Sequence, residues 1–272
     1  MRPHKMQLIL LALIVSLTIN AHPTQAQQAG KTYQQMTHAE RSAFVSEQAR
    51  RIAREMSGSE YEFTASFEGD IQQSVNQYMR RIDNPGGGNA SPRNLRVVFE
   101  RAQGQAPMLI AAFKARNVSP LIGLYIPWVE SEYVNLESPN QMGAIGMFQF
   151  LPQTGEKYGL SVADLLDVGK SADAAARYIT DSLESFKGDP MKEALALLSY
   201  NRGTDRTARE VKFLINDQTK QCSICALTAD RSKLDETFRS ESVFYVPRFF
   251  AAAIIGENPQ AFGIQGQPLS SR

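Results

Sequence analysis

The stretch SPLIGLYIPWVES, residues 119–131, carries the clearest fold signal in the chain. Ser119 can cap a helix while Pro120 occupies its first position, where a missing backbone N–H costs nothing. Apolar side chains then recur at helical spacing and end directly before Glu130. Pro127 lies inside this segment and should kink it, because proline removes a backbone donor and clashes with the preceding turn. The stretch therefore predicts an apolar helix that ends in a carboxylic acid.

Further helices are expected on both sides of this stretch. Thr37-His38-Ala39-Glu40 has the spacing of a capping box and predicts a helix over about 38–56. Ser91-Pro92 repeats the Ser-Pro pattern and predicts another helix start, and a second helix is expected over 106–116. The other expected helices cover residues 69–83, 171–186, 190–200, 204–215 and 245–256.

Signals for β-structure are weak throughout. Alternating apolar and polar residues of useful length are absent, and residues 138–159 are rich in Gly, Gln, Pro and Asn, as loops are. The sequence therefore predicts a mainly α fold with little or no sheet.

The first 26 residues have the pattern of a secretory signal. Arg2 and Lys5 are followed by a short apolar run over 8–19 and by small residues suited to cleavage at 24–26. The run is too short to span a bilayer comfortably, and no later segment approaches the roughly 20 apolar residues that a transmembrane helix needs. We expect a periplasmic protein that is secreted through a cleavable signal peptide and is not stably inserted in the membrane.

Charge and histidine content exclude several function classes. The formal net charge is +1, without the basic stripe that a nucleic-acid partner usually requires. His4 and His22 lie in the signal, which leaves His38 at the start of an expected surface helix. A Ser-His-Asp hydrolase and a His-rich zinc site both need an imidazole in the site. We expect chemistry on carboxylates, hydroxyls and amides, with no metal or organic cofactor.

Cys222 and Cys225 are the two cysteines of the chain. In an oxidising compartment, such a close pair favours a local disulfide that tightens a loop. A redox-active pair would need a flanking strand and a helix opening at the first cysteine, and the neighbouring residues show no such context. The structural interpretation is favoured, and the redox one stays as the alternative.

Glu130 is the outstanding candidate for chemistry. It follows Trp128 and Val129, and an apolar setting disfavours the charged form of a carboxyl, so its pKa should rise toward neutral pH. A general acid needs this property. The alternative is an exposed or helix-capping glutamate, the common state of this residue type. Glu132 and Glu137 lie in more polar sequence and serve as local comparisons.

Short blocks occur in a distinctive order after residue 128. They are VES (129–131), MGAIGMFQFLPQTG (142–155), YGL (158–160), SYNRG (199–203) and FYVPRF (244–249). In this order they resemble the lytic transglycosylases with a goose-lysozyme-like fold. The last block also resembles the membrane-bound lytic murein transglycosylase D subgroup. The resemblance implies a lysozyme-like helical domain preceded by N-terminal helices.

The resemblance also implies roles for particular residues. Glu130 would be the catalytic acid, and Ser131 would support the site as its neighbour. Tyr245 would approach the catalytic carboxyl from the last long helix. The residues implied to line the sugar groove are Gln149, Tyr200 and Asn201.

Each of these positions also has a purely structural interpretation. Gly143, Gly146 and Gly203 would permit close backbone approach in the site, or serve turns alone. Tyr200 and Tyr245 could be ordinary core aromatics, and Gln149 could satisfy loop backbone groups.

The activity implied by the resemblance is cleavage of the β-1,4 bond between N-acetylmuramic acid and N-acetylglucosamine in peptidoglycan, with formation of a 1,6-anhydro ring. One rival is a lysozyme-type hydrolase that adds a second carboxylate; Asp164, Asp167 and Asp173 are the candidates. Another rival is a non-catalytic protein that binds or organises peptidoglycan.

Four segments are expected along the chain. They are a signal peptide (1–26), a leader and helical arm (27–64), the transglycosylase domain (65–262) and a C-terminal tail (263–272). If the protein serves a machine that spans the cell envelope, the polar surface of the helix over 38–56 is the expected docking arm.

Overall fold

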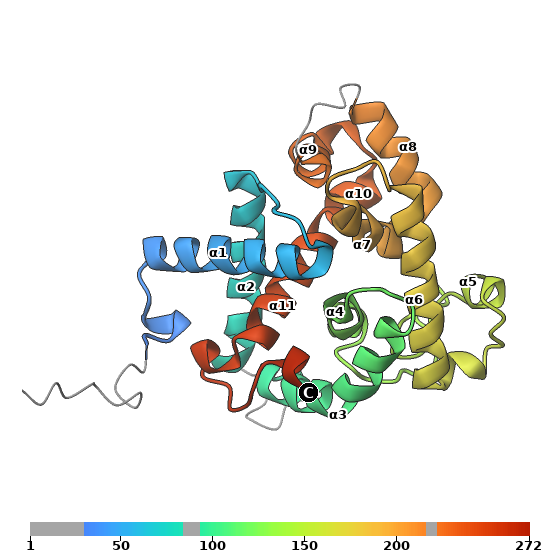
Figure 1. Cartoon of the computed structure of the whole chain (residues 1–272), viewed down its shortest axis with the longest axis horizontal. Coiled ribbons are helices and arrows are strands. Elements are labelled where there is room, and N and C mark those ends of the chain that lie inside the picture. Colours follow the sequence, from blue (N-terminus) through green and yellow to red (C-terminus); the bar gives the residue numbers. More distant parts are fainter. Residues whose placement is uncertain (1–29, 84–92, 216–221) are drawn as a thin grey trace, which may run out of the picture. The chain divides into compact units, whose positions relative to one another are not determined.

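The computed structural model of the chain describes residues 30–83, 93–215 and 222–272 (Figure 1). The expected signal sequence and the Ser91-Pro92 pair lie outside these residues. No helix within the described ranges is both long enough and apolar enough to cross a membrane.

Helices and turns make up the described structure. The α-helices are α1 (His38–Ser57), α2 (Ala65–Asp83), α3 (Leu95–Lys114), α4 (Pro120–Glu130), α5 (Pro152–Lys157), α6 (Val168–Ser185), α7 (Lys192–Arg202), α8 (Thr204–Leu214), α9 (Ser223–Ala229), α10 (Glu236–Ser240) and α11 (Tyr245–Glu257). The 3-10 helices are η2 (Tyr33–Gln35), η3 (Asp164–Leu166), η4 (Arg231–Lys233), η5 (Ser242–Phe244), η6 (Pro259–Phe262) and η7 (Leu269–Ser271). Among the described residues, β-structure is limited to one isolated bridge between Ile145 and Phe150. The predicted mainly α fold is confirmed.

Helix α11 lies at the centre of the packing. It contacts α1, α2, α4 and α7 (Figure 1). Most of its side chains are buried. A helix that is apolar on all sides is a core helix, because no face of it prefers water. Gly256 allows one of these contacts, since a Cβ there would lie 2.4 Å from the hydroxyl oxygen of Tyr125. The start of α11, at Tyr245, is thereby fixed relative to the end of α4.

Helix α1 begins at the predicted capping box. The Thr37 hydroxyl accepts a hydrogen bond from the Glu40 N–H at 3.2 Å, and the Glu40 carboxylate accepts one from the Thr37 N–H at 2.7 Å. The opposite side of α1 is apolar and packs on α2, α4 and α11. The N-terminal helix therefore belongs to the core.

The sequence predicted two separate helices here, one that starts at Ser91-Pro92 and a second over 106–116. This division into two helices was wrong. Helix α3 is continuous through Pro107 and begins after Asn94, whose side chain accepts a hydrogen bond from the Arg96 N–H at 2.9 Å. Its buried face, which includes Ala106 and Leu109, packs on α4 and α6. Packing along this whole face outweighs the one backbone hydrogen bond that Pro107 removes.

The last residues also pack into the protein. Ile264 and Leu269 are 3% and 0% exposed, and the Ser270 N–H donates to the Glu257 carboxylate at 3.1 Å. Lys31–Arg272 forms one compact unit. The boundaries drawn from the sequence at residues 64 and 262 stay predictions.

Candidate active site

Glu130 is the last residue of α4. Ser119 and Pro120 begin the helix as predicted, and the residues from Leu121 to Trp128 are all buried. This anchoring holds the helix end in place. The hydroxyl of Tyr245, the first residue of α11, donates a hydrogen bond to Glu130 Oε1 at 2.7 Å.

The environment of Glu130 shifts its acidity toward neutral pH. Burial raises the pKa of the Glu130 carboxyl to about 7, while the hydrogen bond from Tyr245 and the charge of Arg248 act in the opposite direction. Burial also raises the pKa of the Tyr245 hydroxyl, which therefore stays protonated and remains a donor. A carboxyl whose pKa lies near neutral pH can serve as a proton donor and as a proton acceptor.

A cleft of about 400 Å³ opens beside this carboxyl. It brings together Glu130 from α4, Gln149 from the following loop, and Tyr200 and Asn201 from the end of α7. The other described residues that line it are Asn140, Met142, Ala144, Phe150, Leu151, Thr154, Tyr178, Arg202, Gly203, Arg206, Thr237, Glu241 and Ser242. The volume and mixed polarity suit an organic ligand such as a sugar.

Ser131 follows Glu130 and is not among the described residues that line the cleft. Its side chain is buried, and its hydroxyl donates to the Met147 carbonyl at 2.7 Å. The Tyr133 hydroxyl similarly donates to the Leu124 carbonyl. These bonds tie the residues after Glu130 to α4 and to the next loop.

The loop between α4 and α5 needs its glycines. Gly143 and Gly146 have φ values of 85° and 79°. A Cβ at Gly146 would also lie 2.3 Å from the Leu165 carbonyl oxygen. Gln149, at φ 51°, donates through its side-chain amide to the Gly146 carbonyl at 2.8 Å and accepts from Asn140 at 3.1 Å. The amide of Gln149 is therefore held at the edge of the cleft.

Tyr200 fixes the same loop from the other side. Its hydroxyl donates to the Phe148 carbonyl at 2.9 Å, and its ring packs on Phe150 and Tyr178. Gly203, at φ 85°, then separates α7 from α8 and lines the cleft.

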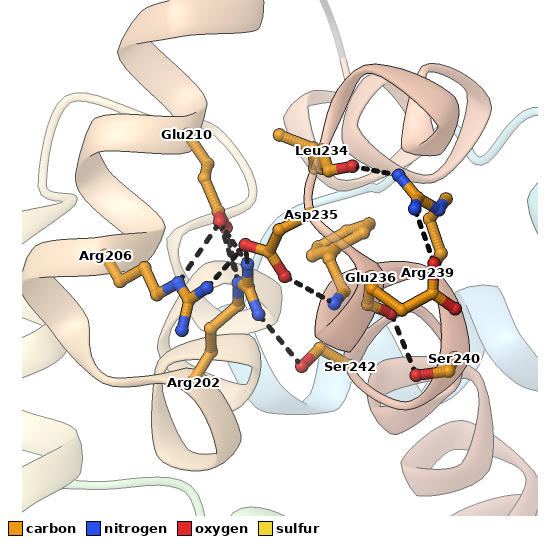
Figure 2. Close-up of polar contacts among 10 residues, drawn as sticks. Arg202, Arg206, Glu210, Leu234, Asp235, Glu236, Arg239, Ser240 and Ser242 are labelled. Atoms are coloured by element: carbon orange, nitrogen blue, oxygen red, sulfur yellow. Dashed lines mark hydrogen bonds and ion pairs between the residues drawn. The ribbon is translucent and has the colours of Figure 1, made fainter.

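Arg202, Arg206 and Ser242 line the cleft near the end of α7. They belong to a network of ion pairs and hydrogen bonds (Figure 2). The Arg202 guanidinium, which is buried, donates to the carboxylates of Glu210 and Asp235 and to the Ser242 hydroxyl. Arg206 pairs with the same two carboxylates. The network joins α7 and α8 to the residues on either side of α10, and so fixes the spacing of the walls.

Several lining residues were not predicted. Asn140 lies two residues before the glycine-rich block over 142–155, and Thr154 lies within it. Glu241 lies four residues before Tyr245. Closeness to these blocks was the sequence signal that could have identified all three as lining residues. Met142, which is 80% exposed, gives the cleft an apolar edge.

The carboxylates proposed for a hydrolase lie elsewhere. Asp164 pairs with Lys170, Asp167 caps α6 and Asp173 pairs with Arg116. Among the described residues, the carboxylates that line the cleft are Glu130 and Glu241.

Cys222 and Cys225 are joined by a disulfide at the start of α9. A helix does open at Cys222, which the sequence did not lead us to expect. The described residues form no strand beside it, and both cysteines are buried. These observations favour the structural role.

Comparison with protein families places part of the chain in a known one. Residues 107–221 match the Transglycosylase SLT domain family. SLT domains are lysozyme-like helical domains that act on peptidoglycan. The matched segment holds Glu130, Gln149, Tyr200 and Asn201, whereas Tyr245 lies beyond it. No curated protein matches the chain.

Proposed function

We propose that the chain is a peptidoglycan lytic transglycosylase, a carbon–oxygen lyase that leaves 1,6-anhydro-N-acetylmuramic acid, with Glu130 as acid and then base. One observation carries the proposal. Glu130, a desolvated carboxyl with a pKa of about 7, lines a cleft and belongs to the segment that matches the SLT family. The block over 244–249 favours the membrane-bound lytic murein transglycosylase D subgroup.

The chemistry needs a single group that first donates and then accepts a proton. Protonated Glu130 gives its proton to the glycosidic oxygen, and that C–O bond breaks while positive charge develops at the anomeric carbon of the muramic residue. The acetamido group of the same sugar helps to stabilise this charge. Ionised Glu130 then takes the proton of the C6 hydroxyl, whose oxygen bonds to the anomeric carbon and closes the anhydro ring. Tyr245 donates to the ionised carboxylate between these steps.

The cleft residues have separate roles in this proposal. Gln149, Tyr200 and Asn201 contact the sugars, since all three line the cleft. Ser131 is a positioning residue that acts through the loop at Met147. Gly143, Gly146 and Gly203 keep the backbone in conformations that this cleft requires.

Glu241 supports a second candidate, a lysozyme-type hydrolase, because it lines the same cleft as Glu130. A hydrolase would use this second carboxylate and would leave a reducing-end sugar in place of the anhydro ring. The third possibility, a protein that only binds glycan, predicts no product.

Mass spectrometry of purified sacculi after digestion distinguishes these functions. The wild type should release anhydro-muropeptides, and Glu130→Gln should release none above background. Glu132→Gln is the matched control, since Glu132 is two residues away and pairs with Arg81 outside the cleft. Reducing-end products would establish the hydrolase, and a wild type without products would contradict enzymatic function.

We also propose a periplasmic location, based on the signal pattern of residues 1–26. Fractionation of cells that express the full chain should place the processed protein in the periplasm. Recovery of the uncleaved chain in the cytoplasm would contradict this location. Any partner in an envelope-spanning machine remains a prediction from the polar surface of α1.

A further inference from the structure

A second pocket of about 440 Å³ adjoins the cleft. It is lined by the end of α5, by α6 and by the first half of α8, and we call it the side pocket. The residues that line both the side pocket and the cleft are Thr154, Tyr178, Arg202, Gly203 and Arg206. A molecule bound in the cleft can therefore extend a branch into the side pocket next to it.

The side pocket is rich in positive charge. Its cationic lining residues are Lys157, Arg202, Arg206 and Arg209. Arg202 and Arg206 are already paired with Glu210 and Asp235 (Figure 2). Lys157 and Arg209, in contrast, form no ion pair with a described residue. Two cations on different helices are thus available to a ligand.

Two further features determine the net potential. The first turn of α8 lines the side pocket, and the positive end of its helix dipole adds to the potential there. Asp205 is the carboxylate among the described lining residues, and it offsets part of the charge. Asp181, which accepts the Tyr158 hydroxyl, adds a second carboxylate next to the side pocket. Among the described lining residues, four are cations and one is a carboxylate.

Two aromatic rings, those of Tyr158 and Tyr178, also line the side pocket. The Tyr158 hydroxyl donates to Asp181 at 2.9 Å, and the Arg177 guanidinium lies 5.3 Å from the Tyr158 ring centre. The Tyr178 hydroxyl donates to the Ser199 carbonyl at 2.7 Å. Both rings are therefore held in place. A pocket lined by fixed aromatic rings and by cations suits a short chain that carries carboxylates.

We infer that the side pocket binds the acidic stem peptide of a muramic residue held in the cleft, through Lys157 and Arg209. The inference rests on the proposed function. Stem peptides branch from the lactyl group of muramic acid and carry free carboxylates, which match the two cations. The branch point lies on the glycan strand, which matches the continuity of the side pocket with the cleft. The side pocket thus makes the enzyme prefer glycan strands that bear peptides.

Two substrates test the inference: glycan strands with their stem peptides, and the same strands stripped of peptide by an amidase. Lys157→Gln combined with Arg209→Gln should lower kcat/KM on peptide-bearing strands by roughly fivefold, the loss of two exposed charge contacts. On stripped strands kcat/KM should stay within about twofold, and the difference should shrink as salt screens the charges. Lys212→Gln is the matched control, since Lys212 is an exposed cation on α8 outside both pockets.

The outcomes separate this inference from the proposed function. Suppose that anhydro products form but the double variant has the same kcat/KM as Lys212→Gln on both substrates. The side pocket then does not bind the peptide. The same conclusion follows if kcat/KM of the double variant falls equally on both substrates. If no wild-type product forms from either substrate, the proposed function fails. Binding of peptide-bearing fragments to Glu130→Gln, with and without the two substitutions, then still tests the side pocket. Unchanged affinity would overturn the inference.

Discussion

At the scale of single residues, the pair of Glu130 and Tyr245 sets the acidity of the site. Burial disfavours the carboxylate, and the Tyr245 hydroxyl partly compensates by donating to it. The balance leaves the pKa of Glu130 at about 7, near the pH at which an acid that must later act as a base is most effective.

Tyr245→Phe removes the hydrogen bond that stabilises the charged form. The pKa of Glu130 should therefore rise above about 7, and the alkaline limb of the kcat/KM profile should move to higher pH. The maximal rate should fall by roughly tenfold or more, because the ionised intermediate state loses a donor. Tyr33→Phe is the control, since its hydroxyl bonds Asn76 outside the cleft. An unshifted alkaline limb would argue against this role of Tyr245.

The same burial costs stability at high pH. The pKa of Glu130 is about 7 in the folded protein and 4.5 in the unfolded chain, so between these values only the folded protein keeps the proton. The contribution of this carboxyl to stability is therefore complete below pH 4.5 and is lost as pH rises through 7. Glu130→Gln avoids this loss. We expect the variant to gain about 2 kcal/mol over the wild type at pH 8, or roughly 5 °C in Tm, and much less at pH 5.

Differential scanning calorimetry at the two pH values measures this gain. Glu132→Gln removes a half-buried ion pair with Arg81 and should gain nothing at pH 8. Equal Tm values for the wild type and Glu130→Gln at pH 8 would mean that Glu130 is well solvated.

At the scale of elements, the loop between α4 and α5 depends on glycine where side chains cannot fit. Gly146→Ala combines a φ of 79° with a Cβ placed 2.3 Å from the Leu165 carbonyl. We expect a loss of about 2–4 kcal/mol in the free energy of unfolding and a large loss of activity, because Gln149 bonds the Gly146 carbonyl.

Gly104→Ala is the opposite case within α3. Apart from the backbone of its own helix and the two neighbouring residues, no described atom lies within 4 Å of the added Cβ, and the glycine is exposed. Alanine should stabilise the helix by about 0.5–1 kcal/mol and leave activity unchanged. Urea titration of both variants checks the contrast. A Gly146→Ala variant as stable as the wild type would show that the loop adapts.

Local chemistry explains which elements were predictable. The capping box at Thr37 and the start of α4 at Ser119-Pro120 depend on a few neighbouring residues, and both are present as predicted. The continuity of α3 through Pro107 depends on packing against α4 and α6, which no local pattern reveals. Gln149 could be predicted as a cleft residue because it lies in a distinctive sequence block. Glu241 was not predicted, because its place in the cleft depends on how the chain folds around α10.

At the scale of the whole compact unit, Lys31–Arg272, the N-terminal helix and the site share one core. Ile52 on α1 is 0% exposed. Ile52→Ala should lower the free energy of unfolding by about 2–5 kcal/mol. Trp128, the single tryptophan, is buried two residues from Glu130 and reports on the site by fluorescence.

If the unit unfolds cooperatively, Ile52→Ala shifts the transition seen by Trp128 fluorescence together with that seen by far-UV circular dichroism. Glu47→Ala, at an exposed position of α1, should change stability by about 0.5 kcal/mol or less. An unchanged fluorescence transition in Ile52→Ala would mean that α1 unfolds separately, as an arm would.

The bond between Tyr245 and Glu130 joins positions 115 residues apart. The family match ends at residue 221, so a recombinant fragment cut to its limits would lose the phenol that steadies the acid. It would also lose α11 and bare the apolar surface of α4 to water. Such a fragment should aggregate, and screens that express only the matched segment would then miss the activity proposed for the whole chain.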